Sequence, residues 1–458
     1  MKSKFLLAAL VAATVAIAGS LLSAAHLVAL PAAALASLRW LAILLFAVYA
    51  TARRSLTSWI FAGLFAGTEL GYDWPTVAVQ MQFLGNIFLR LIKVIIAPLL
   101  FGILVTGIAG HANLKKVGRL GVKSLIYFEV VSTIALLIGF AAINISRAGE
   151  SIHLPPSTGT ESLNVTPHTA TQIITDIFPE NIAKSVAEGQ VLQVVVFSIL
   201  FAMGLLMVPE TKRRPMLVFA ESLSETMFKF TNLVMYAAPI GIFGAVAYTV
   251  GHMGLAVLLP LLKLLATCYI AFAVFIIFVV LPILKFARIP LKPFFRCIIE
   301  PVTLGFATAS SEATLPRAME EMVVFGVPRE TVAFVLPTGY SFNMAGASIY
   351  QALGLIFVAQ AAGVHLTWGQ QGMMLLTLFV SSKGTAGVAR ASFLIVFGAA
   401  TSFHLPMEPL FLLFAIDQLM DMGRTAVTVL GNCVACVVIA RWEGELPNPA
   451  AAAVPALQ

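Results

Sequence analysis

Long apolar runs separated by short charged segments make up most of the chain. Five runs of spanning length lie between basic clusters or turns, at 83–108, 124–145, 191–208, 227–250 and 255–284. About 20 consecutive apolar residues in a helix cross the hydrocarbon core of a bilayer, so each run predicts a membrane-spanning helix. The pattern therefore predicts an all-α polytopic membrane protein.

The first 55 residues are less clearly divided. An apolar run covers residues 5 to about 30 and fits either a first span or a signal peptide, with small residues at 23–25 suited to cleavage. A shorter run follows at 38–50, and a third run at 59–71 is interrupted by polar residues. Residues 1–55 are accordingly predicted to form an amino-terminal extension with signal-like or extra membrane segments.

The last third of the chain does not alternate cleanly between spans and loops. Small polar residues break two apolar stretches at 308–316 and 381–392, and the apolar arms around each break are too short to span a bilayer alone. Each predicts a hairpin that enters the membrane and turns back, and each precedes a span with its own polar interruption. Two such units in opposite orientation form an inverted repeat, a layout typical of secondary transporters.

The final span carries three charges on one face. Asp417 and Asp421 are four residues apart, and Arg424 follows three residues later, so helical geometry aligns their side chains. Each charge at mid-bilayer costs about 2.5–3.5 kcal/mol on insertion scales. We therefore expect a binding site in the interior of the helix bundle. An internal salt bridge is the alternative for Asp421 and Arg424, but it does not explain Asp417.

Composition and charge agree with a membrane protein. The 458 residues are 60% hydrophobic and 11% charged, and the mean hydropathy is +0.96. The net charge of +7 comes from Lys and Arg in short loops, which indicates the positive-inside rule rather than a nucleic-acid surface. The longest polar loop, at about 146–185, then faces outside.

The sequence gives no sign of an enzyme or of a bound cofactor. Cys433 and Cys436 form a CxxC pair within a span, without a second pair or a nearby His, and we interpret them as small helix-packing residues. No nucleophile–base set or metal-ligand cluster is apparent. The polar residues converge at one depth, whereas a channel would line a pore along its length.

Four motifs in the last third closely resemble the dicarboxylate/amino acid:cation symporter family, the family of the glutamate transporters. They are Ser310-Ser311-Glu312 with Thr314-Leu315-Pro316, Pro337-Thr338-Gly339-Tyr340-Ser341-Phe342-Asn343-Met344, Ser382-Lys383-Gly384 with Ala386-Gly387-Val388, and Asp421-Met422-Gly423-Arg424-Thr425. The likeness is strongest to the proton-coupled bacterial members. It extends more weakly over 80–290.

The resemblance implies a glutamate-transporter fold with two re-entrant helical hairpins in an inverted repeat. It implies a homotrimer in the bacterial inner membrane, working by an elevator movement. Residues 56–290 would supply scaffold and peripheral transport-domain helices, residues 291–445 the core transport domain, and residues 446–458 a disordered tail. The partners would be the lipid bilayer and a small anionic substrate, with no nucleic acid.

The resemblance also assigns site residues. Ser310, Ser311 and the second hairpin tip around Val388 would hold the α-carboxylate of the substrate. Asp421 would bind its amino group, and Arg424, assisted by Thr425, its side-chain carboxylate. The remaining position of the expected substrate site is Thr428.

The chain differs from the sodium-coupled members of the family at residues that bind the co-transported cation. Ala345 and Asn432 stand where those members carry Asp, so at least two usual sodium positions lack a carboxylate. Glu312 and Asn432 together resemble the proton-coupled members, and we expect Glu312 to bind the co-transported proton. Asn343, Asn432 and Asp417 are then remnants of cation sites. No resident cofactor is expected, and sodium coupling is the less favoured alternative.

Two substrate classes remain open. Asp421 together with Arg424 favours glutamate or aspartate, while an Asp421 that only neutralises Arg424 would suit a C4-dicarboxylate such as succinate, fumarate or malate. Ala347, Thr428 and Arg390 differ from the residues usual in the family at these positions, so the motifs do not decide between the two substrate classes. Simpler interpretations also exist: Ser310 and Ser311 as helix caps, Glu312 as a solvated loop acid, and Asn343 as an interhelical hydrogen-bonding residue.

Overall fold

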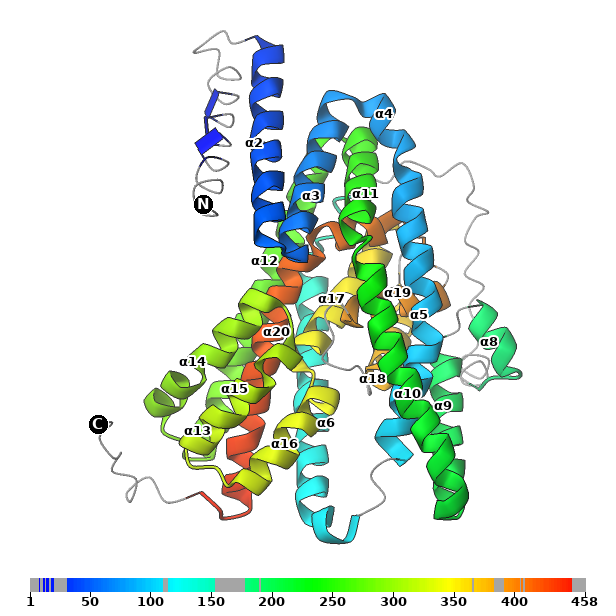
Figure 1. The fold of residues 1–458 in the computed structure, drawn as a ribbon, viewed down its shortest axis with the longest axis vertical. Helices are drawn as coiled ribbons and strands as arrows, with labels where there is room; N and C mark the ends of the chain where they lie inside the picture. The colour runs from blue at the N-terminus through cyan, green and yellow to red at the C-terminus, as the bar shows by residue number, and fades with distance from the viewer. Residues whose placement is uncertain are drawn as a thin grey trace. The chain divides into compact units, whose positions relative to one another are not determined.

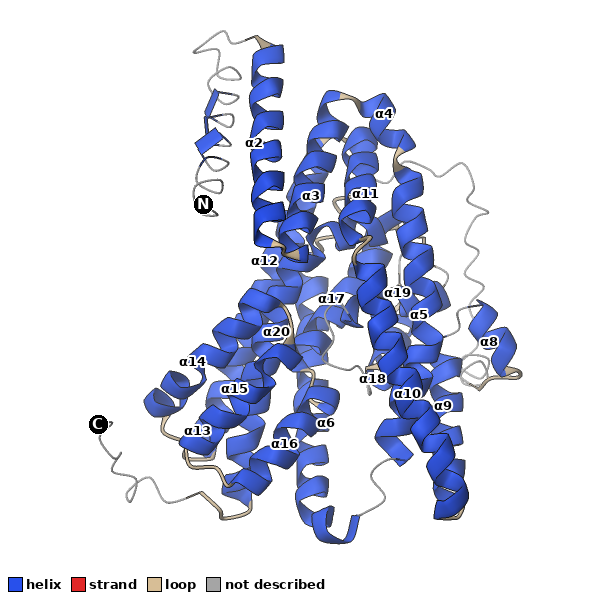
Figure 2. Cartoon of the chain, in the orientation of Figure 1, coloured by secondary structure: helices blue, strands red, loops and turns tan. Residues whose placement is uncertain are grey.

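The computed structural model describes residues 31–109, 114–152, 178–188, 191–364, 366–382, 391–403, 405–406 and 408–446, together with scattered positions among the first 30. Every regular element in these ranges is helical (Figures 1 and 2). The all-α prediction is therefore confirmed. The proposed cleavage region at 23–25 and the tail from 447 onward lie outside the described residues.

Five described helical segments are long and apolar enough to cross a membrane. They are Ala33–Arg53, Leu120–Ser146, Leu255–Phe286, Arg329–Ala361 and Glu408–Trp442. A sixth is added if two consecutive helices, Glu210–Met235 and Ala238–Met253, count as one bent span. These segments support the prediction of a polytopic membrane protein.

The chain divides into two compact units. The first contains residues 1–92, 229–261 and 410–418. Its helices include α2 (Ala32–Arg53), α3 (Leu56–Asp73), α4 (Pro75–Gln80), the start of α5 (Gln82–Ala109), the end of α10 (Glu210–Met235), α11 (Ala238–Met253) and η1 (Leu255–Val257). α3 packs along both α2 and α11. A Cβ atom on Gly67 of α3 would lie 2.6 Å from the Phe243 carbonyl oxygen, so glycine permits the close approach of α3 to α11.

The second unit contains residues 93–228, 262–409 and 419–458. Its helices include α6 (Leu114–Ser146), α8 (Ile182–Glu188), α9 (Val191–Met207), most of α12 (Leu258–Phe275), η2 (Ile276–Val280), α13 (Leu281–Phe286) and the main part of α20 (Glu408–Trp442). Six further helices, α14 to α19, form the interrupted segments described below. α17 packs along α6 and against α19, which places the broken span in the interior of this unit.

Both predicted hairpin breaks are breaks between helices. α14 (Leu291–Thr308) and α15 (Ser311–Val324) pack against each other and are joined through Ala309, whose φ of 50° is left-handed. α18 (Trp368–Ser381) packs against α19 (Ala391–Ser402), and the tip between them lies outside the described residues. The re-entrant position of these hairpins in a bilayer stays a prediction.

The interrupted span predicted before the second hairpin is also present. α16 (Arg329–Phe342) ends at Asn343, and α17 (Ala345–Ala361) begins two residues later. The backbone of Asn343 and Met344 is non-helical, with ψ angles of 66° and 52°. α20, by contrast, runs unbroken for 35 residues through the charged stretch.

Two spans predicted from the sequence differ in detail from the helices of the structure. The single span predicted at 227–250 is divided between two helices, α10 and α11, which are bent by 51° relative to each other. Pro239 follows the bend, and proline disfavours helical backbone in the residue before it and removes one N–H donor. The run predicted at 38–50 is the longer helix α2, whose amino-terminal part includes the charged Arg39.

Candidate functional site

The centre of the predicted site lies on one face of α20. The Arg424 Nε–H donates to Asp421 Oδ1 at 2.7 Å, and each side chain is only 4% exposed. The Thr425 hydroxyl lies 3.4 Å from the same carboxylate oxygen. The i, i+3 and i, i+4 spacings noted in the sequence produce these contacts directly. A cation, an anion and a hydroxyl are thereby held together away from water.

α17 supports the guanidinium from a second side. The Arg424 Cζ lies 4.3 Å from the centroid of the Tyr350 ring, and Tyr350 is completely buried. One helical turn earlier, a Cβ on Gly346 would lie 2.1 Å from the Arg424 carbonyl oxygen. Only glycine permits this approach of α17 to α20. The aromatic face then fixes the plane of the guanidinium fork.

The first hairpin lies beside this part of α20. A Cβ on Gly305 of α14 would lie within 3.5 Å of methyl groups of Thr314, Thr425 and Val429. The Thr314 hydroxyl donates to the Ser311 carbonyl at 2.6 Å and lies 3.0 Å from the Tyr340 hydroxyl. These contacts join α14, α15, α16 and α20 around the break at 309–310.

Ser310 and Ser311 occupy this break. Ser310 is the N-cap of α15 and accepts from the Ala313 N–H at 3.4 Å, which is the capping role considered above. Ser311 is buried at the first position of α15. A substrate role for either residue stays a prediction. So does the proton-binding role of Glu312, whose side chain lies outside the described residues, although its backbone belongs to the first turn of α15.

The two asparagines predicted as cation-site remnants are in contact. The Asn343 Nδ2–H donates to Asn432 Oδ1 at 3.1 Å, and both residues are fully buried. Asn343 Oδ1 and Asn432 Nδ2 are buried with no hydrogen-bond partner among the described residues. Ala345, at 0% exposure, offers no oxygen in its side chain. The pair thus joins the broken span to α20 through amide groups rather than carboxylates.

The remaining predicted residues are distributed as follows. Thr428 is buried one turn beyond Arg424 on α20. Asp417 is fully buried on the same helix, in the segment that belongs to the first unit. Val388 and Arg390 lie in the second hairpin tip, outside the described residues. Of the predicted site, the structure therefore describes the residues on α20 and those at the first hairpin break. The residues of the second hairpin tip lie outside the described ranges.

α12 supports α20 from outside the predicted motifs. The Tyr269 hydroxyl donates to the Leu419 carbonyl at 2.8 Å, and a Cβ on Gly423 would lie 2.8 Å from the Phe272 ring. Sequence reasoning missed Tyr350, Gly346 and Tyr269. Gly346 and Tyr350 are four residues apart in the stretch that follows the polar break, a spacing that could have identified them as one face toward α20.

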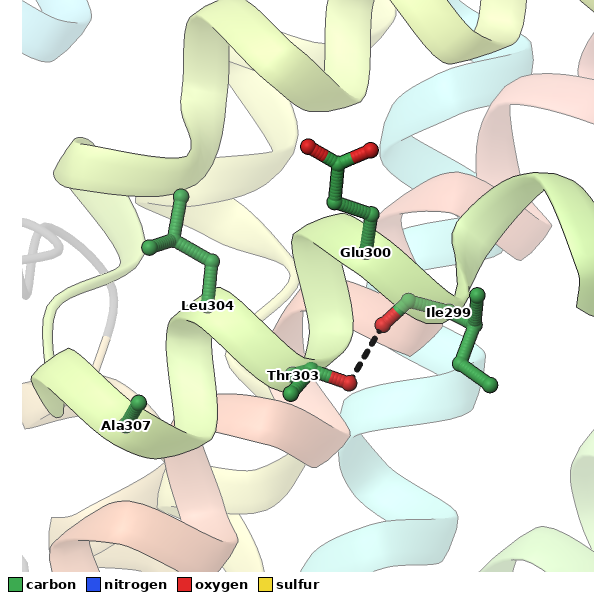
Figure 3. Close-up of a pocket in the computed structure, with 5 residues that line it drawn as sticks. All are labelled: Ile299, Glu300, Thr303, Leu304 and Ala307. Carbon is green, nitrogen blue, oxygen red and sulfur yellow. Dashed lines mark hydrogen bonds between the residues drawn. The ribbon is translucent and has the colours of Figure 1, made fainter.

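Other features do not add a second candidate site. A shallow pocket on α14 is lined by Ile299, Glu300, Thr303, Leu304 and Ala307, and contains none of the predicted site residues (Figure 3). Its Thr303 hydroxyl donates to the Ile299 carbonyl of its own helix at 2.6 Å. Cys433 and Cys436 are buried free thiols, and the part of the chain that the structure describes holds no group of three metal-ligating side chains.

Comparison with known proteins agrees with the motifs. The model of the sodium:dicarboxylate symporter family matches residues 56–442. A proton/sodium-glutamate symport protein of Bacillus caldotenax is 38% identical, over 84% of this chain and 94% of that protein. The proton/glutamate-aspartate symporter of Escherichia coli strain K12 is 37% identical, over 85% and 92%.

A relative that is named for a different substrate class is equally similar. The C4-dicarboxylate transport protein of Bacillus subtilis strain 168 is 37% identical, over 86% of this chain and 94% of that protein. Overall identity thus does not distinguish the two substrate classes. The matched length and these relatives nevertheless fix the family: the chain belongs to the sodium:dicarboxylate symporter family, and is a multi-pass membrane transporter rather than an enzyme.

Proposed function

We propose that this transporter is a proton-coupled symporter of acidic amino acids, glutamate or aspartate. The observation that carries the proposal is the buried Asp421–Arg424 pair with the Thr425 hydroxyl beside it. A carboxylate suits the ammonium group of the substrate, and a guanidinium suits its side-chain carboxylate. The two relatives named as glutamate symporters support the same substrate class.

Proton coupling is supported by the Asn343–Asn432 contact. A sodium ion needs several oxygen ligands, and anionic ligands best offset its dehydration. Here an amide hydrogen bond of 3.1 Å joins these two side chains, and Ala345 supplies no ligand. Glu312 remains the candidate for the titrating group. We further propose a homotrimer in a bacterial inner membrane that binds no nucleic acid, with alternating access by an elevator movement.

A C4-dicarboxylate is the second candidate substrate. The specific observation in its favour is that Asp421 already neutralises Arg424 within the pair, at 2.7 Å. A substrate with two carboxylates and no ammonium group would not require Asp421 as a direct partner. A relative named as a C4-dicarboxylate transport protein supports this alternative.

Binding of aspartate and of succinate to purified protein separates the two classes. We expect aspartate to raise the melting temperature of the wild type, since a ligand of the folded state stabilises it by mass action. Asp421→Asn should abolish the aspartate shift, because it removes the anion that faces the ammonium group. Stabilisation by succinate alone, retained in Asp421→Asn, would contradict the amino acid proposal.

Uptake into proteoliposomes tests the coupling ion. An inward proton gradient without sodium should drive accumulation of labelled aspartate in wild-type protein. A sodium gradient at equal pH should not drive it. Accumulation that requires sodium and ignores the proton gradient would overturn proton coupling.

A further inference from the structure

One carboxyl group outside the site described above stands by itself in an apolar segment of spanning length. Glu129 is the only charged residue between Lys123 and Arg147, and it belongs to the continuous helix α6. It falls inside the apolar segment Leu120–Ser146 that is long enough to cross a membrane. Charged residues at such positions are rare and usually functional, because the charged form is costly in hydrocarbon.

The depth of Glu129 follows from the anchor at one end of α6. Lys123 forms an ion pair with Glu443, donates to the Trp442 carbonyl at 3.1 Å and lies 5.2 Å from the centroid of the Trp442 ring. Such a lysine and tryptophan are typical of the membrane interface. Glu129 is six residues further along, which corresponds to about 9 Å of helix at 1.5 Å per residue. It therefore lies well inside the apolar segment.

Glu129 is at the edge of the exposed face of α6. Its neighbours on that face are Leu125, Ile126 and Val130, which are 48%, 51% and 53% exposed, while Glu129 itself is intermediate. Phe128, on the opposite side, is completely buried. The carboxyl thus occupies a position that is neither in the packed interior nor at the aqueous end of the helix.

The buried side of the same turn reaches the polar pair. A Cβ on Gly339 would lie 2.3 Å from Asn432 Oδ1 and 3.5 Å from the Phe128 ring. Hence the residue next to Glu129 packs where α16 meets the Asn343–Asn432 contact. A change in the charge of Glu129 would act on a helix that adjoins the candidate site.

The helices that pack against α6 carry few other charged or titratable residues. α6 packs against α16, α17 and α18, and α18 carries no charged residue. α16 carries Arg329 and Glu330 in its first turn, and its Tyr340 hydroxyl is bonded to Thr314. Tyr350 of α17 faces Arg424. On α6 itself the neighbouring groups are Tyr127 and Lys123, and the latter is paired with Glu443.

We propose that Glu129 is a second proton-binding group of the transport cycle. The carboxylate takes up one proton where the carrier faces the proton-rich side, crosses as the neutral acid, and releases the proton on the other side. The neutral form is the one that an apolar environment favours. This inference rests on the proton coupling proposed above, and adds a titrating group to the candidate Glu312.

Accumulation at steady state measures the number of coupled protons. The full-length protein is reconstituted into liposomes with a pH difference of one unit and the membrane potential clamped at zero. Under these conditions each coupled proton contributes a factor of about 10 to the accumulation ratio of labelled aspartate. We expect Glu129→Gln to lower the ratio about tenfold, and to leave aspartate binding and aspartate exchange in place.

Two further variants keep the test decisive. Glu129→Asp retains a titratable group and should restore much of the ratio. Glu150→Gln alters an exposed carboxyl beyond the end of the same helix and should match the wild type. If Glu129→Gln does not fold, the readout is the infrared difference spectrum between low and high pH of wild type and Glu129→Asp. A carboxylic acid band that differs between the two proteins is expected, and identical spectra would overturn the role of Glu129.

The outcomes also separate this inference from the proposed function. A wild type that accumulates aspartate with the proton gradient, beside a Glu129→Gln variant with an unchanged ratio, overturns the role of Glu129 alone. Failure of the wild type to respond to the proton gradient overturns the proposed coupling, and the role of Glu129 with it.

Discussion

Two of the arginine–carboxylate pairings in the molecule, one on α20 and one between α2 and α3, have different surroundings. On α20, Arg424 and Asp421 are three residues apart, 4% exposed, and in contact with the broken span through Tyr350. Between α2 and α3, Arg39 pairs with Glu69 and also donates to Asp73 at 2.9 Å. Asp73 additionally accepts from the Trp40 indole at 3.0 Å, and Arg39 remains 21% exposed.

The two pairings differ in what they connect. We call the contacts of Arg39 with Glu69 and Asp73 the clamp between α2 and α3. The Arg39 contacts join residues 30 and 34 positions apart, so they hold one helix against another. α2 lies outside the part of the chain that the family model matches. The Arg424 pair is formed within a single helix and adds no connection between helices by itself. The ligand-binding role proposed above would account for a buried charged pair that does not itself join two helices.

The largest effect is expected for Arg424→Ala. The variant leaves Asp421 buried without its cation, which should lower stability by about 3–5 kcal/mol and abolish substrate binding. Unfolding in detergent and binding of labelled aspartate are the measurements. Arg424→Lys keeps the charge, so it should recover stability more than binding. Normal affinity in either variant would contradict a role for the guanidinium in recognition.

Arg39→Ala tests the clamp between α2 and α3. Loss of the cation leaves Glu69 and Asp73 with fewer partners in a half-buried environment, and we expect stability to fall by about 1–3 kcal/mol. Because these helices hold none of the predicted site residues, affinity for aspartate should not change. The same two assays apply, and a loss of affinity at unchanged stability would refute the distinction drawn here.

Tyr350→Leu removes the aromatic face under Arg424 and preserves an apolar side chain. The cation–π contact is worth about 0.5–2 kcal/mol, so affinity should fall by up to about 30-fold. Isothermal titration with aspartate gives the change. Tyr350→Phe retains the ring and serves as the matched control. Equal affinities for the Leu and Phe variants would show that the ring does not orient the guanidinium.

The smallest effects come from two matched changes of one hydrogen bond. Thr425→Val removes the hydroxyl beside Asp421, and Trp40→Phe removes the indole donor to Asp73. Each should cost about 0.5–1.5 kcal/mol. Titration with aspartate should register the first as weaker binding only, while thermal unfolding should register the second as lower stability only. Weaker aspartate binding by Trp40→Phe would contradict the expectation that the region around Arg39 affects stability alone.

Features set by local order along the chain could be predicted from the sequence. The shared face of Asp421 and Arg424 follows from helical spacing, and the breaks at 309–310 and 343–344 follow from clusters of small polar residues in apolar stretches. The family motifs extended the same reasoning to the substrate. The geometry of these elements agrees with the predictions.

Features that depend on helix docking could not be predicted in this way. The contacts of Arg39 with Glu69 and of Arg424 with Tyr350 join residues 30 and 74 positions apart, and nothing in local spacing fixes which helices meet. Glu129 is a different case. It stands alone in an apolar run, and this isolation is visible in the sequence itself.

The anchor formed by Lys123, Glu443 and Trp442 has a mechanical consequence. It ties the beginning of α6 to the end of α20, so neither helix can slide along the other without breaking an ion pair and a hydrogen bond. α6 bears the proposed proton group and α20 bears the substrate pair. If the proposed transport movement takes place, these contacts favour a step in which the proton group and the substrate pair keep a fixed spacing and move together.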